Sequence, residues 1–162
     1  MRVVAILLLL LFLLGGCAKA PPVYADDVSC EALMEAVEKQ IPVEFGYAIM
    51  KGEELRAYVP SAELPEDYCL RYSTLSENIN EIGILHTESK EEQAAAEALC
   101  EAYLKELWEE KQAFIASYAP EELPKLEHAE VRSFGRYTVY AILDDDDRTR
   151  IFDAIEQLLT PK

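Results

Sequence analysis

Four adjacent carboxylates, Asp144 to Asp147, are the densest group of chemically capable side chains in this sequence. Carboxylate oxygens are the ligands that Ca²⁺ prefers. The run nevertheless lacks the alternating acids, the central glycine and the closing glutamate of an EF-hand loop. Aspartate is favoured at the N-cap and in the first turn of a helix, and Arg148 and Arg150 follow to offset the repulsion. We therefore interpret the run as the beginning of a helix and predict no metal site.

His86 and Glu88 form the second candidate group. His86 falls at the end of an expected strand, two residues before Glu88, and residues two apart on a strand share a face. A histidine beside a carboxylate can act as a general base and its orienting partner. The sequence has no nucleophile motif such as GxSxG to complete this arrangement, and His128 stands alone. We assign no catalytic residue, and we keep a small hydrolase that uses His86 as an alternative function.

Cys17 has the most specific sequence context of any residue. It follows Arg2, an unbroken apolar run over residues 3–14, and a glycine pair. The run has the length of a signal-peptide core and is short for a membrane span. Its end, Leu14-Gly15-Gly16-Cys17, resembles the bacterial lipobox, in which small residues precede a cysteine that receives a diacylglyceryl group. We predict a lipoprotein signal peptide over residues 1–16 and lipid attachment at Cys17, because two acyl chains anchor a protein stably.

This prediction places the protein on the extracytoplasmic face of a bacterial cell membrane, held there by its lipid. Residues 17–26 would form a spacer that contains a proline pair, and residues 27–162 a single domain. The formal net charge is −16. Nucleic acids and anionic membrane surfaces are bound through clustered basic side chains, so the charge argues against both as partners.

The other cysteines are Cys30, Cys69 and Cys100. They form no CxxC pair, so neither a thioredoxin-like redox site nor a zinc ribbon is indicated. We favour three small buried thiols, and one disulfide with a remaining thiol is the alternative.

Hydrophobic periodicity predicts an α+β domain. We expect an N-terminal helix and then an antiparallel sheet of about four strands with helices on one face, in an order that suggests a duplicated ββα unit. The expected helices are Asp26–Gln40, a brief one at Glu53–Val59, a long one from Glu88 or Ser89 to about Tyr118, a turn or two at Glu121–Glu127, and Arg148–Leu159. The expected strands are Tyr68–Thr74, Glu81–Thr87, Glu130–Phe134 and Tyr137–Leu143.

The long helix carries an apolar stripe that we expect to face the core. We interpret Trp108, which lies beside this stripe, as a packing residue. Tyr72 and Tyr140, both on strands, are the better candidates for an exposed aromatic face. The stripe contains Ala96, Leu99, Cys100, Tyr103, Leu107, Phe114 and Tyr118.

Residues 64–160 resemble a family of uncharacterised bacterial lipoproteins, found mostly in Gram-positive anaerobes, that contain domain of unknown function 4358. The resemblance rests on the strand-turn-strand around Asn78–Ile84, on Phe114 near the end of the long helix, on Ser117–Glu121, and on Phe134–Tyr137. It implies a lipidated surface protein. It brings no activity, ligand or catalytic residue to this chain.

Together these features predict a non-enzymatic binding or interaction domain of the bacterial cell envelope. We expect a membrane contact through the lipid and an envelope protein as a partner, and we expect no cofactor. A small envelope hydrolase and a structural or assembly-accessory lipoprotein are the alternatives. A clustered polar pocket around His86 would favour the hydrolase.

Overall fold

The computed structural model describes residues 22–41, 47–50 and 64–161. It confirms the α+β class and the antiparallel sheet, which has five strands in the order β1-β2-β3-β5-β4. The predicted signal peptide, Cys17 and the brief helix at Glu53–Val59 lie outside the described residues. In chain order the strands are β1 (Tyr47–Met50), β2 (Asp67–Ser73), β3 (Glu81–His86), β4 (Glu130–Phe134) and β5 (Tyr137–Ile142).

The helices also follow the predicted order. The N-terminal helix precedes the sheet, and its cap is Ser29, whose side chain accepts a hydrogen bond from the amide of Ala32. Ser89 caps the long helix in the same way through the amide of Glu92. The helices are α2 (Cys30–Glu38), α4 (Lys90–Tyr118), a 3-10 turn η2 (Pro120–Glu122), α5 (Leu123–Glu127) and α6 (Asp145–Leu159).

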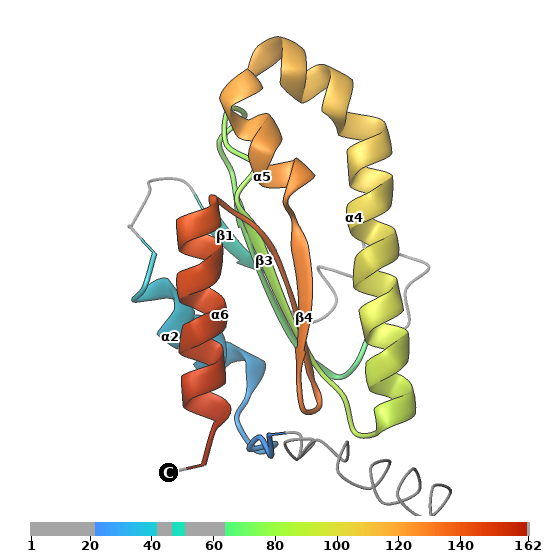
Figure 1. Cartoon of the computed structure of the whole chain (residues 1–162), viewed down its shortest axis with the longest axis vertical. Coiled ribbons are helices and arrows are strands. Elements are labelled where there is room, and N and C mark those ends of the chain that lie inside the picture. Colours follow the sequence, from blue (N-terminus) through green and yellow to red (C-terminus); the bar gives the residue numbers. More distant parts are fainter. Residues whose placement is uncertain (1–21, 42–46, 51–63, 162) are drawn as a thin grey trace, which may run out of the picture.

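Helices cover both faces of the sheet, so the prediction of helices on one face was wrong. Figure 1 shows the sheet between α2 and α6 on one side and α4 on the other. The reason is that apolar side chains point to both faces of β2. Cys69 packs with α2 and α6, while its neighbours Tyr68 and Leu70 pack with α4. Every residue of β5 is buried, as expected for a strand covered twice.

The predicted ββα duplication is not confirmed. The two ββα segments follow each other in the chain, but α4 and α6 lie on opposite faces of the sheet. A two-fold axis through the sheet between β3 and β5 would place both helices on the same face. The similar element order is therefore not a structural repeat.

The apolar stripe of α4 is buried only in part. Ala96 and Cys100 lie against the sheet, and Ile115 is buried near the end of the helix. Phe114 and Tyr118 were predicted to face the core, but 57% and 76% of their surfaces are exposed. The 29-residue helix is longer than the strands that it covers. Its last turns therefore extend past most of the sheet and are less buried.

Within the described ranges, no helix is both long enough and apolar enough to cross a membrane.

Candidate functional site

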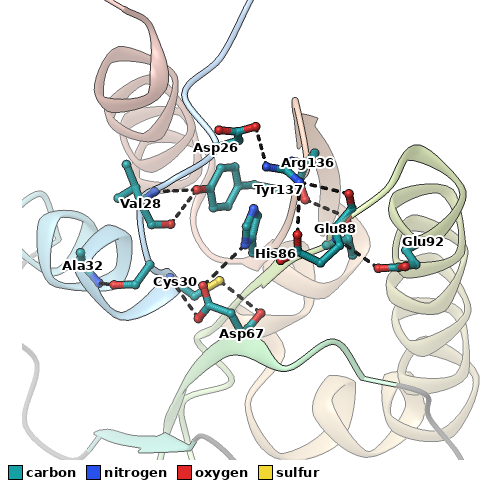
Figure 2. Close-up of polar contacts among 12 residues, drawn as sticks. Asp26, Val28, Cys30, Ala32, Asp67, His86, Glu88, Glu92, Arg136 and Tyr137 are labelled. Carbon is teal, nitrogen blue, oxygen red and sulfur yellow. Dashed lines mark hydrogen bonds and ion pairs between the residues drawn. The ribbon is translucent and has the colours of Figure 1, made fainter.

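His86 lies at the end of β3 in a polar cluster with residues from three other segments (Figure 2). Its imidazole stacks on the ring of Tyr137, with centroids 4.5 Å apart, and its Nδ1 atom is 3.8 Å from the carboxylate of Asp67. Glu88, the predicted partner, turns instead toward Arg136, where its carboxylate accepts a hydrogen bond of 3.4 Å. The His86–Glu88 pair is therefore not formed, and the partner is a residue on the neighbouring strand.

Cys30 is the nearest group to this cluster that could serve as a nucleophile. Its backbone amide donates to the Asp67 carboxylate at 3.1 Å, and its thiol donates to the Asp67 carbonyl oxygen at 3.5 Å. The side chain is fully buried, and burial raises the pKa of the thiol far above its ordinary value, with Asp67 adding to the effect. A reactive cysteine needs access and a lowered pKa, so this arrangement is structural.

The cluster fastens the chain that leads into α2. The hydroxyl of Tyr137 donates to the carbonyl of Val28 at 2.6 Å and accepts from its amide at 3.0 Å. Arg136 forms an ion pair with Asp26. Closer to the N-terminus, the amide of Ala25 donates to the Leu159 carbonyl at 2.7 Å. These contacts therefore fix the segment that precedes α2 close to the C-terminal end of α6.

The four aspartates open α6, as predicted. Asp144 is the N-cap residue and Asp145 to Asp147 form the first turn, although the Asp144 side chain caps no backbone amide. Arg148 pairs with Asp145 at 2.7 Å, and Arg150 pairs with Asp147. The remaining histidine, His128, lies 3.1 Å from Asp145 and is exposed. In the described part of the chain, no three His, Cys, Asp or Glu side chains are placed to hold a metal ion.

The thiols of Cys69 and Cys100 are free and buried, like that of Cys30.

A groove of about 560 Å³ lies at the other end of the sheet, between the last turns of α4 and the connection from β2 to β3. Phe114 and Tyr118 stand along it, with ring centroids 4.6 Å apart. Tyr72, predicted as part of an exposed aromatic face, lines the groove and is partly buried. Tyr140, the other residue of that prediction, is buried. Exposed aromatic side chains beside a groove are typical of binding surfaces.

Glu81 is the acidic side chain at the sheet side of this groove. One of its carboxylate oxygens accepts two hydrogen bonds, from the hydroxyl of Tyr140 at 2.6 Å and from that of Tyr103 at 2.9 Å. Burial raises the pKa of Glu81 above its ordinary value, although the two tyrosine hydroxyls act in the opposite direction. The carboxylate is thus a partly desolvated acceptor within an otherwise largely apolar wall.

A buried ion pair supports the wall of the groove that the β2–β3 connection forms. The ammonium group of Lys125 lies 2.7 Å from the carboxylate of Glu122 and donates to the Asn80 side chain at 3.0 Å. Glu122 also accepts from the amide of Ile79 at 3.0 Å. Both charged side chains are nearly fully buried. The pair connects α5 and η2 to the β2–β3 connection, and so holds one wall of the groove.

Sequence reasoning missed this groove. Tyr72 was predicted as part of an exposed aromatic face and Phe114 as part of the apolar stripe. Glu81 was predicted only as the first residue of a strand. An acidic residue next to turn formers, immediately before the apolar run of a strand, is the signal that could have drawn attention to Glu81. The tyrosines that bind it come from α4 and β5, so no local pattern could have found them.

The fold and the groove define a small α+β domain whose antiparallel sheet is covered by helices on both faces. A family model described as "Domain of unknown function (DUF4358)" matches residues 56–143, which is more than half of the chain, so this protein belongs to that family. The match ends just after β5 and includes the groove, Glu81 and the Lys125–Glu122 pair. Comparisons with curated proteins and with solved structures found no match.

Proposed function

We propose that this protein is a lipid-anchored binding protein on the extracytoplasmic face of a bacterial cell membrane, and that the groove beside α4 holds its ligand. The observation that carries the binding function is the groove itself, with its exposed aromatic pair and its partly buried carboxylate. The lipobox-like sequence ending at Cys17 supports the anchor. Nothing in this proposal requires a chemical reaction at the groove.

The path of the chain is consistent with this function. Tyr24 already contacts the domain, because its hydroxyl donates to Glu156 at 3.1 Å and its ring packs edge-on against Phe134. Seven residues of chain from Cys17 to Tyr24 span at most about 25 Å. The helix α4 is itself about 43 Å long, at 1.5 Å for each of its 29 residues. Since the groove lies at the far end of α4 from this attachment, a protein anchored at Cys17 can present the groove away from the lipid surface (Figure 1).

The hydrolase alternative has one observation in its favour, which is the proximity of His86 to Asp67. A general base must reach a nucleophile or a water on the substrate. The His86 side chain is only 11% exposed and stacks on Tyr137, and the neighbouring Cys30 thiol is protonated and buried. This geometry supports a role in fastening the N-terminal segment better than a role in catalysis.

Photo-crosslinking on intact bacteria tests the binding function. A benzoylphenylalanine at position 114, at the groove, should give a discrete adduct with an envelope component. The same residue at position 158 is the matched control, because Leu158 on α6 is similarly exposed and apolar. The mass of the adduct separates a small ligand from an envelope protein partner. Equal labelling from both positions, or none from position 114, would contradict the proposal.

A further inference from the structure

Glu81, the acceptor at the wall of the groove, has no cationic partner in the part of the chain that the structure describes. Among the described residues, no lysine, arginine or histidine forms an ion pair with Glu81, whose contacts are the hydroxyls of Tyr103 and Tyr140. Lys111 is the only basic residue among the described lining residues, and it is exposed and makes no ion pair with Glu81. Elsewhere in the domain the buried carboxylate of Glu122 is neutralised by Lys125.

An unneutralised carboxylate in this setting is energetically unfavourable. Removing a charge from water costs free energy unless a counter-ion or sufficient hydrogen bonds replace the water. The two tyrosine hydroxyls compensate in part, yet burial still raises the pKa of Glu81. Ionisable groups held in such environments beside a cleft are frequent at functional sites. A cationic group that enters the groove would supply the missing charge.

We propose that Glu81 is the counter-ion for the ammonium group of a small organic amine, whose flat apolar body lies along Phe114 and Tyr118. This assignment names the ligand of the groove and rests on the proposed function. A carboxylate and aromatic faces that line one groove suit an ammonium group, because both attract a positive charge. The net charge of −16 also favours the approach of cationic ligands.

An ammonium group fits this site better than a metal ion or a polypeptide. Calcium needs six or more oxygen ligands, and magnesium is held by carboxylates in near-octahedral geometry. Glu81 belongs to no cluster of three potential metal ligands within the described residues. A volume of about 560 Å³ falls in the usual range for small-molecule sites. The ligand is therefore assigned as a free amine of low molecular mass.

Calorimetric titration of the full-length protein in mild detergent tests the assignment. The probes are tyramine, its neutral isostere tyrosol, and the peptide acetyl-Gly-Lys-Gly-amide. Tyramine should bind at micromolar to millimolar concentration, and tyrosol should bind at least about tenfold more weakly, a difference of ~1.4 kcal/mol. Glu81→Gln should weaken tyramine binding by a similar factor. The control Glu106→Gln, which removes a charge from an exposed position on α4 outside the groove lining, should leave it unchanged.

Equal binding of tyramine by the wild type and by Glu81→Gln would overturn the assignment, as would no binding of tyramine at millimolar concentration. Binding of the peptide alone would also overturn it, because the ammonium group would then come from a polypeptide. The two tests can be told apart. If photo-crosslinking gives a discrete adduct from position 114 but calorimetry gives any of these results, the groove still binds a ligand and only the assignment of that ligand as a small amine is rejected.

The pH dependence of stability gives a second readout for Glu81. Its raised pKa means that the folded state favours the protonated form, so its contribution to stability is present at acid pH and is lost as pH rises through the folded pKa. Glutamine mimics the protonated acid and can accept the same hydrogen bonds. Glu81→Gln should therefore match the wild type at acid pH and be more stable at neutral pH. Lower stability of Glu81→Gln at neutral pH would identify Glu81 as a structural residue and contradict the proposal.

Discussion

Replacing Lys125 by methionine should lower the free energy of unfolding by about 3–5 kcal/mol. The substitution keeps much of the apolar length of the side chain and removes the charge that neutralises Glu122, 2.7 Å away. The Glu122 carboxylate would then remain buried with the amide of Ile79 as its principal partner. Urea unfolding followed through the fluorescence of Trp108, the single tryptophan, measures the change.

The control for this prediction is Lys105→Met on α4. Lys105 and Glu109 form an exposed pair 3.9 Å apart, and such pairs contribute at most about 0.5 kcal/mol. A double variant, Lys125→Met with Glu122→Gln, should recover a large part of the loss, because glutamine is uncharged and still accepts a hydrogen bond from Ile79. If Lys125→Met and Lys105→Met lowered the free energy of unfolding by similar amounts, the buried Lys125–Glu122 pair would not stabilise this part of the domain, which contradicts the prediction.

Gly83→Ala should lower the free energy of unfolding by about 3 kcal/mol, at the upper end of the usual cost of overpacking. Gly83 on β3 lies directly opposite Tyr140 on β5, and the tyrosine ring covers it. A Cβ atom at position 83 would lie 2.0 Å from Cε1 of that ring. The ring is buried and its hydroxyl is held by Glu81, so it has little freedom to move away. The same urea titration measures the loss.

The comparison for this variant is Gly135→Ala in the turn between β4 and β5. Gly135 has a φ of +63°, so alanine there introduces backbone strain of about 1–2 kcal/mol, with a contact of 3.2 Å to Tyr24. Gly83→Ala should be the more damaging of the two, and it should also disturb the Tyr140–Glu81 hydrogen bond. A Gly83→Ala protein with wild-type stability would contradict the packing of this ring on the glycine.

The helices and strands that were predicted most accurately have a clear hydrophobic periodicity and a clear boundary residue. β4 has the predicted bounds Glu130–Phe134, and α4 begins at Lys90, one or two residues after the predicted start at Glu88 or Ser89. The first helix, predicted over Asp26–Gln40, spans only Cys30–Glu38, because Ser29 caps it. β1 was missed because its four residues are too few for a reliable alternation.

The arrangement of the helices and of the site could not be predicted in the same way. Which face of the sheet a helix covers depends on connections between distant segments, so α4 and α6 were placed on the same face. The contact of Glu81 with Tyr103 and Tyr140 joins residues 22 and 59 positions apart. The partner of His86 is Asp67, 19 positions away on the paired strand, while the sequence offered Glu88.

Intact-mass spectrometry of the protein isolated from bacterial membranes is the decisive test of lipid anchoring at Cys17. We expect a chain that begins at Cys17 and carries the mass of a diacylglyceryl group, while Cys17→Ala lacks the lipid and keeps the preceding residues. Envelope fractionation should then find the wild type in the membrane, with its domain accessible to protease from the outside. An unmodified Cys17, or cleavage at another position, would contradict the anchored binding protein proposed here.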